Sequence, residues 1–273
     1  MVEVLPEALR SRLLERGIEW PGQLEHHETL PSTNDRLKEW ARAGAPEWSC
    51  VIADQQTAGR GRHGREWASP PGNLYLSLLV RSAGAAEGPP TTFSLAAGVA
   101  VAEALAEFGV LARLKWPNDV VGVSSRKLAG ILVEATTSGS TLETLVIGIG
   151  INLTQRHGAL PRELRSSATT VAAEAGRPVE RSDLAAALLG QLLERVVETR
   201  SDSRRALERW RDHSLEWWGS TVEVRSGEET LRGVAQGIDA SGALLLEMGN
   251  GEIRSVISGE ARALRLRTGT RIH

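Results

Sequence analysis

The sequence predicts two unequal domains, a larger one that mixes α-helices with β-strands and a small antiparallel β-barrel at the C-terminal end. Three observations carry this prediction. The chain has 273 residues, more than one domain usually needs. Helical and strand-like periodicities are mixed up to Trp218, and short alternating strands with glycine turns follow. We therefore expect domains at residues 1–218 and 219–273.

The composition is that of an ordinary globular protein, with 41% hydrophobic and 24% charged residues. A net charge of −2 argues against a general nucleic-acid binder, which is usually strongly basic. The single cysteine, Cys50, excludes an internal disulfide and a Cys₂His₂ zinc site. The charged N-terminal segment contains no apolar core of signal-peptide length, and the most apolar stretch, residues 93–102, is too short for a membrane span. We expect a soluble, cytoplasmic protein without nucleic-acid or membrane partners.

The first elements are two helices with a strand between them. The apolar spacing of Leu9, Leu13 and Leu14 predicts a short amphipathic helix over residues 6–16. Residues 26–30 resemble a strand, and either Ser32 or Thr33 can cap the helix that follows and ends near Gly44.

The middle of the chain alternates strands with helices around one irregular segment. Residues 57–73 are too rich in Gly, Arg and Pro for regular structure. We expect strands at 48–56, 73–80, 112–119, 126–137 and 141–153, and a helix with a wide apolar face at 91–109. Residues 160–210 are mostly helical in pattern, and the strands after Trp218 predict the barrel.

Residues 59–64 match the GxGxxG dinucleotide-binding pattern, but the match is rejected. That pattern needs a helix to begin at the glycines, whereas Pro70 and Pro71 follow here. A Walker loop is excluded as well, since Arg65 and Glu66 stand where Lys and Ser or Thr are required. The segment instead offers arginines, whose forked guanidinium groups bind carboxylate or phosphate, between glycines that admit close backbone approach. The alternative is a solvated basic loop.

Four further features suggest a ligand site. Trp67 could cover a flat ring such as adenine, or pack beneath the loop. The pair Asn118–Asp119 suits a hydroxyl, an adenine edge or hydrated Mg²⁺, although ordinary turns also contain it. Lys127 opens an apolar strand, so its ammonium faces a cavity or the strand end unless it is a surface lysine. Gly148 and Gly150 lie within a strand, which often marks a ligand close to the backbone.

The histidines show no metal-ligand spacing, and no Ser-His-Asp arrangement stands out. The residues therefore favour anion binding and electrostatic stabilisation, which suits acyl-phosphate or nucleotidyl chemistry better than hydrolysis.

Six motifs, in this order, resemble those of biotin–protein ligases. They are STN at 32–34, QTAGRGRHGREW at 56–67, SPPGNLYLS at 69–77, KWPNDV at 115–120, KLAGILVE at 127–134 and IGIGIN at 147–152. One such motif alone would be weak, whereas six in order are specific. The resemblance is close over residues 28–170 and extends to the C-terminal strands in pattern only.

The resemblance implies an α+β fold, with a mixed-sheet catalytic domain similar to class II aminoacyl-tRNA synthetases and a C-terminal SH3-like barrel. It also implies a two-step reaction. Biotin and ATP first form biotinyl-5′-AMP and pyrophosphate, and a lysine of a biotin carboxyl carrier protein or domain then accepts the biotin as an amide. Arginine, lysine and Mg²⁺ would offset the repulsion between carboxylate and phosphate.

By the same resemblance, Lys127 and Arg62 are the catalytic residues. The implied biotin-binding residues are Ser32, Thr33, Asn34, Gln56, Gly59, Arg60, Gly61, Arg62, Lys127, Gly130 and Gly150. The implied ATP- and adenylate-binding residues are Arg60, Arg62, Arg65, Trp67, Asn118, Lys127 and Asn152, with Asp119 as a candidate for Mg²⁺.

Two departures from the family pattern and two alternatives qualify the resemblance. His63 stands where arginine is common, and only residues 1–31 precede the first motif, too few for the DNA-binding domain of bifunctional members. We therefore expect the monofunctional type, for which a homodimer stays open. The alternatives are a lipoate or octanoate–protein ligase on the same fold and a non-enzymatic biotin sensor.

Overall fold

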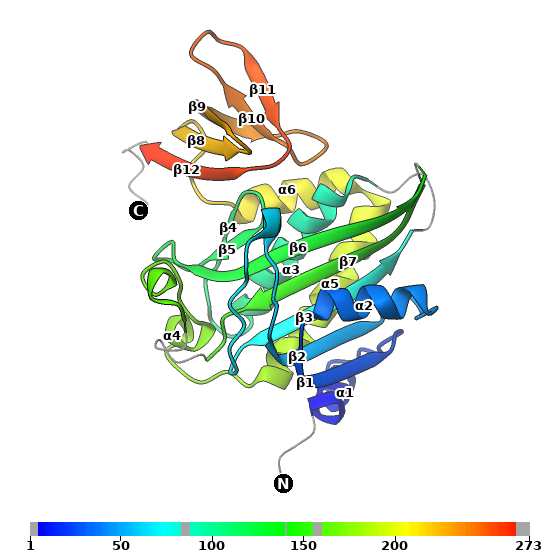
Figure 1. Cartoon of the computed structure of the whole chain (residues 1–273). Coiled ribbons are helices and arrows are strands. Elements are labelled where there is room, and N and C mark those ends of the chain that lie inside the picture. The colour runs from blue at the N-terminus through cyan, green and yellow to red at the C-terminus, as the bar shows by residue number, and fades with distance from the viewer. Residues whose placement is uncertain (1–4, 83–87, 140, 155–159, 266–273) are drawn as a thin grey trace.

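A seven-stranded mixed sheet organises the larger domain of the computed structural model, which describes residues 5–82, 88–139, 141–154 and 160–265. The strand order is β1-β2-β3-β7-β6-β5-β4 (Figure 1). Strand β1 pairs with β2 in parallel, and all other neighbours are antiparallel. The strands are β1 Leu24–Leu30, β2 Cys50–Gln56, β3 Leu74–Arg81, β4 Arg113–Lys115, β5 Asp119–Val121, β6 Lys127–Ser138 and β7 Thr141–Ile151.

Helices cover the two faces of this sheet unequally. Helices α1, α3, α5 and α6 pack together behind the sheet in the view of Figure 1, whereas α2 lies alone across its front. Helix α3 is buried on nearly all sides because it lies between the sheet and α5, which explains its wide apolar face. The bounds are α1 Leu5–Glu15, α2 Thr33–Arg42, α3 Pro90–Ala106, α4 Val171–Ala175, α5 Arg181–Ser201 and α6 Ser203–His213.

Local sequence signals account for most of these elements. Of the two residues expected to cap α2, Ser32 is the N-cap, since its Oγ accepts a hydrogen bond from the backbone N–H of Asp35 at 3.4 Å. Residues 112–119, expected as one strand, are split between β4 and β5 because Pro117 and Asn118 form a turn between them. Residues 57–73 contain only one short 3₁₀ turn, η1 Arg62–Gly64, as their composition predicts.

The C-terminal segment forms a separate antiparallel sheet of five strands in the order β11-β10-β9-β8-β12, beside α6 (Figure 1). Its β9–β10 turn meets the larger domain, where the Trp116 indole N–H donates to the carbonyl of Gly242 at 3.0 Å and the Thr91 hydroxyl donates to that of Ser241 at 2.5 Å. The strands are β8 Thr221–Ser226, β9 Glu229–Ile238, β10 Leu244–Glu247, β11 Ile253–Val256 and β12 Glu260–Arg265. The expected second domain extends to residues 266–273, which lie outside the described part.

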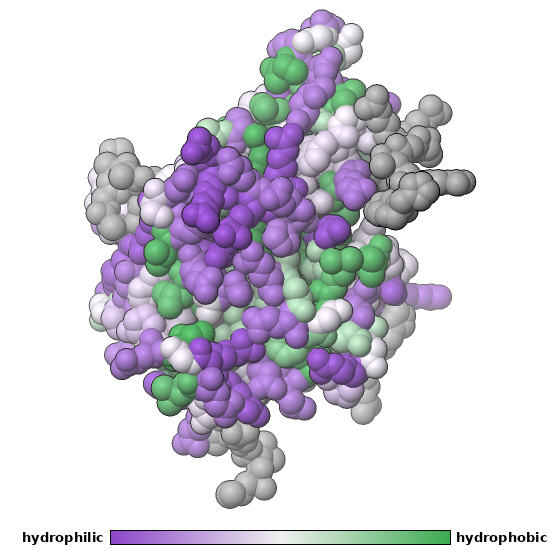
Figure 2. Space-filling model, turned by 180° about the vertical axis from the view of Figure 1, so that it is seen from behind, coloured by the Kyte–Doolittle hydropathy of each residue, from purple (hydrophilic) through white to green (hydrophobic). Residues whose placement is uncertain are grey.

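The face of the molecule opposite α2 is predominantly hydrophilic, with separated hydrophobic groups between the polar side chains (Figure 2). Within the described residues, no helix has the length and apolar character needed to cross a membrane. Helix α2 and the segment after β2 lie across the front of the sheet (Figure 1). Polar side chains from these segments and from the strands line a cavity there.

Candidate active site

A cavity of about 150 Å³ opens on the α2 side of the sheet, and it collects nearly all the residues that the sequence motifs nominate. The N-terminal end of α2, strands β6 and β7 and the loop after β2 form its walls. The nominated residues that line it are Ser32, Thr33, Asn34, Gln56, Arg60, Gly61, Arg62, Arg65, Trp67, Asn118, Asp119, Lys127, Gly130 and Gly150.

The two nominated residues outside the lining, Gly59 and Asn152, support it from behind. A Cβ at Gly59 would lie 2.4 Å from the Ser69 Oγ, so only glycine fits at this position. The Asn152 Nδ2 donates to the backbone carbonyl of Lys127 at 3.1 Å. Both residues therefore position neighbouring groups of the cavity.

Side-chain hydrogen bonds hold the cavity wall between α2 and β2. The Gln56 Oε1 accepts from the backbone N–H of Thr33 at 2.9 Å and lies 3.1 Å from the Thr33 hydroxyl oxygen. The Gln56 Nε2 donates to the Ser69 Oγ at 2.9 Å. This amide is therefore fixed in one orientation and leaves part of its donor capacity for a ligand.

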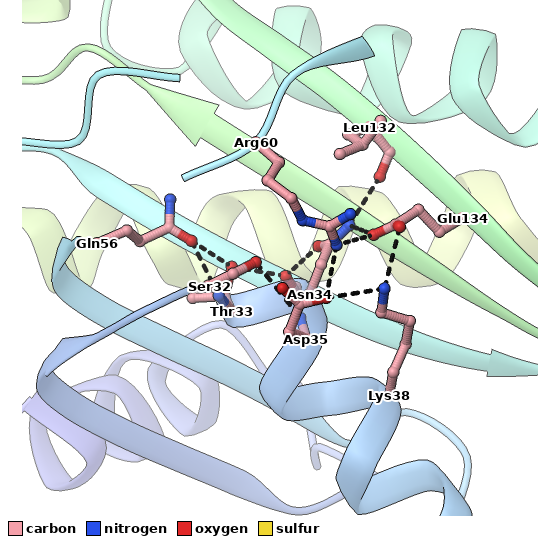
Figure 3. Close-up of polar contacts among 10 residues, drawn as sticks. Ser32, Thr33, Asn34, Asp35, Lys38, Gln56, Arg60, Leu132 and Glu134 are labelled. Atoms are coloured by element: carbon pink, nitrogen blue, oxygen red, sulfur yellow. Dashed lines mark hydrogen bonds and ion pairs between the residues drawn. The ribbon is translucent and has the colours of Figure 1, made fainter. Parts of the chain in front are cut away.

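The Asn34 side chain, nominated as a ligand contact, is saturated by the protein (Figure 3). Its Nδ2 donates to the carbonyl of Leu132 at 3.3 Å and to the Glu134 Oε2 at 2.8 Å, while its Oδ1 lies 2.5 Å from the Ser77 Oγ. A Cβ at Gly148 would lie 2.1 Å from that Oδ1, so the strand must have glycine there. Asn34 thus builds the wall and keeps no free donor for a ligand.

The glycine-arginine loop, defined here as residues 59–67, is a narrow hairpin over the cavity. The backbone N–H of Trp67 donates to Gly59 at 2.9 Å, and that of Gly61 donates to Arg65 at 2.7 Å. His63 has φ = 55° and Gly64 has φ = 72°, so the chain reverses through two left-handed residues. This turn explains why a residue other than arginine is compatible with position 63.

The three arginines of the loop differ in what they contact. Arg60 pairs with acidic residues of α2 and β6 (Figure 3), and Arg65 pairs with Glu260 of the C-terminal sheet. The Arg62 guanidinium makes no hydrogen bond or ion pair within the described residues, and partial burial lowers its pKa. Arg62 is therefore the loop cation that is available to an incoming anion.

Two glycines form a flat floor for the Trp67 indole. Gly130 of β6 and Gly150 of β7 are directly paired across the sheet. A Cβ at Gly130 would lie 2.9 Å from the Trp67 ring, and one at Gly150 would lie 2.5 Å from its Nε1. A side chain at either glycine would therefore displace the indole from this position. The buried Trp67 Nε1–H has no hydrogen-bond partner among the described residues.

The Lys127 ammonium lies beside this indole. Its Nζ is 2.6 Å from the Asp119 Oδ1 and 5.0 Å from the centroid of the Trp67 ring. The backbone of Lys127 is fixed by Ser167, whose carbonyl accepts its N–H at 2.8 Å. The ammonium thus faces the cavity, as one of the two interpretations of the sequence expected. Asn118 stabilises the turn between β4 and β5, since its Nδ2 donates to the carbonyl of Ile131 in β6 at 2.8 Å.

Sequence reasoning missed two parts of this site. Gly130, Leu132 and Glu134 alternate on one face of β6, so a period of two would have placed the Glu134 carboxylate on the cavity side. Residues 259–261, at the start of β12, line the cavity rim from the C-terminal sheet. No local signal predicts that contact, because it depends on how the two domains pack.

The chain is similar to known protein ligases over most of its length. The chain matches the biotin/lipoate A/B protein ligase family over residues 27–152 and the biotin protein ligase C-terminal domain over residues 218–261. It is 34% identical over 267 residues to the biotin–[acetyl-CoA-carboxylase] ligase of Mycobacterium tuberculosis, with 95% of both chains covered. It is 37% identical over 240 residues to the bifunctional ligase/repressor BirA of Escherichia coli, which covers 85% of this chain and 71% of that protein.

The fold is also similar to a solved biotin protein ligase from Aquifex aeolicus in complex with biotin and ATP. That similarity has a TM-score of 0.76 at 31% sequence identity and covers 89% of this chain and 99% of the other. Since similarity of this level spans most of both chains, the protein belongs to the biotin protein ligase family.

Proposed function

We propose that this chain joins the carboxylate of biotin to the α-phosphate of ATP, releasing pyrophosphate. It then transfers the biotinyl group from the adenylate to a lysine of a biotin carboxyl carrier domain, forming an amide and releasing AMP. The observation that carries the proposal is the placement of the Lys127 ammonium and of the Arg62 guanidinium, which has no ion-pair partner in the described part of the chain, at one glycine-floored cavity. Carboxylate and phosphate repel each other, and fixed cations between them stabilise the charge that develops as they react.

Each region of the cavity suits one part of the two substrates. The hydrogen-bonding wall of Ser32, Thr33 and Gln56 suits the ureido ring of biotin, and Lys127 then lies on the side of the carboxylate. Trp67 provides an aromatic surface for adenine.

Magnesium would accompany ATP rather than occupy a site formed by the protein alone. The described residues contain no group of three or more His, Cys, Asp or Glu side chains that could hold a metal ion. Mg²⁺ is commonly held by one or two carboxylates together with substrate phosphates and water. Asp119, whose carboxylate already lies beside Lys127, fits the protein ligand of such an ion. The ion would offset phosphate charge.

The fold-level parts of the proposal are a kinship with class II aminoacyl-tRNA synthetases and an SH3-like barrel after residue 218. The mixed sheet supports the first, and the five-stranded antiparallel order supports the second. The domain match that begins at residue 218 and the strand that begins at Thr221 support the boundary. Cys50 is fully buried, and its burial raises the thiol pKa, so it suits a structural role in a reducing cytoplasm.

The test mixes the full chain with biotin, MgATP and a biotin carboxyl carrier domain, and measures pyrophosphate release and covalent biotin on the carrier. We expect both signals, each dependent on biotin, and neither with lipoate or octanoate in its place. Pyrophosphate release with lipoate or octanoate would favour the alternative acyl ligase. Biotin binding without pyrophosphate release would instead identify a sensor.

A further inference from the structure

Four charged side chains form a closed ring beside the cavity (Figure 3). The Arg60 Nη2 lies 2.7 Å from the Asp35 Oδ1 and 2.8 Å from the Glu134 Oε2. The Lys38 Nζ lies 2.8 Å from the same Asp35 oxygen and 3.0 Å from the Glu134 Oε1. Two cations and two carboxylates therefore alternate, and the ring has no net charge.

Glu134 is the more firmly held of the two carboxylates. It stands on the interior strand β6 with its side chain 23% exposed, whereas the Asp35 side chain on α2 is 46% exposed. Partial burial would raise the pKa of the Glu134 carboxyl, but hydrogen bonds from Asn34, Lys38 and Arg60 outweigh it and hold the pKa below its ordinary value. The carboxylate is thus ionised at neutral pH and accepts from three donors.

The ionised Glu134 carboxylate determines which groups donate and which accept in a series of hydrogen bonds. Because ionised Glu134 can only accept, the Asn34 amide must turn its Nδ2 toward it and its Oδ1 toward Ser77. Ser77 has one hydroxyl hydrogen, which it donates to the Asn34 Oδ1, so it accepts from the Thr33 hydroxyl, whose Oγ1 lies 2.7 Å away. This series of hydrogen bonds therefore runs from Glu134 to Thr33, whose backbone N–H donates to the Gln56 Oε1 in the wall of the cavity.

We propose that Glu134 is a positioning residue for biotin binding. Its carboxylate anchors Arg60, and with it the glycine-arginine loop, and through Asn34 it orients the polar groups of the opposite wall. This inference rests on the proposed function, since it assigns the wall to biotin. Glu134 is not among the residues that line the cavity, whereas Arg60 and Asn34 are. It therefore acts through its hydrogen bonds to these two residues rather than on the substrate.

The test compares Glu134→Gln with Glu143→Gln, the same change at an exposed residue of the neighbouring strand β7. Glutamine keeps the size of Glu134, but it loses the charge and adds a donor that permits the Asn34 amide to reverse. We expect the biotin Kd, measured by calorimetry without ATP, to rise about tenfold, or about 1.4 kcal/mol. Single-turnover pyrophosphate release at saturating biotin and MgATP should change less than about threefold, and Glu143→Gln should leave both unchanged.

A double variant separates positioning from a merely structural effect. If Glu134 acts partly through Arg60, Arg60→Ala combined with Glu134→Gln will raise the biotin Kd by less than the product of the single effects. Equal biotin affinity of Glu134→Gln and the parent, or a lowered Tm with unchanged affinity of the folded protein, would overturn the inference. Failure of the parent chain itself to bind biotin would instead contradict the proposed function.

Discussion

At the residue scale, Lys127 is the side chain whose removal tests the chemistry most directly. Its ammonium lies in the cavity beside Asp119 and Trp67, where a fixed cation can stabilise charge developing between carboxylate and phosphate. We expect Lys127→Ala to reduce the rate of adenylate formation by about 10²–10³-fold, comparable to the loss of one preorganised donor. The measurement is single-turnover pyrophosphate release at saturating biotin and MgATP.

The control for this variant is Arg126→Ala. Arg126 is the preceding basic residue, but it is exposed and donates a hydrogen bond to the Ser124 hydroxyl. It should retain the parent rate and change stability by less than about 0.5 kcal/mol, as an exposed substitution usually does. If Lys127→Ala stays within about twofold of the parent, under 0.5 kcal/mol in barrier, Lys127 has no part in the chemistry.

At the scale of the elements, the paired strands β6 and β7 make the floor on which Trp67 lies. A methyl group at Gly150 would lie 2.5 Å from the Trp67 Nε1, so Gly150→Ala must displace the indole. We expect the KM for ATP to rise roughly 3- to 10-fold, equivalent to about 0.5–1.5 kcal/mol of lost aromatic contact. Initial rates at saturating biotin measure this change.

The matched control is Gly249→Ala in the C-terminal sheet. Gly249 has open space around its Cα, so an added methyl group contacts nothing there. Its KM for ATP should equal that of the parent. An unchanged KM in Gly150→Ala as well would show that the strand floor does not position Trp67.

At the scale of the whole molecule, acid should destabilise the fold through carboxylates of both domains. In Glu25, a hydrogen bond from Arg36 lowers the pKa despite some opposing burial. In Asp239, burial would raise the pKa, but hydrogen bonds from Ser241 and Ser255 outweigh it and lower the pKa. A lowered native pKa stabilises the fold at neutral pH, and this stabilisation is lost as pH falls through the native pKa.

Asp239→Asn tests this linkage at the turn where the C-terminal sheet meets the larger domain. Loss of the charge-assisted hydrogen bonds should cost about 1–2 kcal/mol of unfolding free energy at pH 7. The difference from the parent should shrink as pH falls from about 5 toward 2, because the parent then loses the same charge. Urea unfolding at several pH values measures it. Asp212→Asn, at an exposed helix residue, is the control, and an equal loss there would refute the assignment.

The sequence by itself determined the features that depend on neighbouring residues. The cap of α2 falls at Ser32 or Thr33, alternating residues make the C-terminal strands, and the glycines and prolines of residues 57–73 prevent regular structure. These follow from turn chemistry, capping and periodicity, which act within a few residues. The ordered motifs also nominated most of the cavity lining, because each motif lies at the end of one such element.

Only the tertiary structure decided which of those residues form ion pairs within the protein and which can bind a ligand. Arg60 and Arg62 both adjoin Gly61 in the loop, yet Arg60 pairs with Glu134, 74 residues away, whereas Arg62 makes no ion pair with any residue that the structure describes. Arg65 similarly meets Glu260, 195 residues away in another domain. An ion pair forms wherever packing brings opposite charges together, and its partners carry no periodicity or spacing that marks them in the chain. The fold therefore determines which loop arginines pair within the protein and which one can bind an anion.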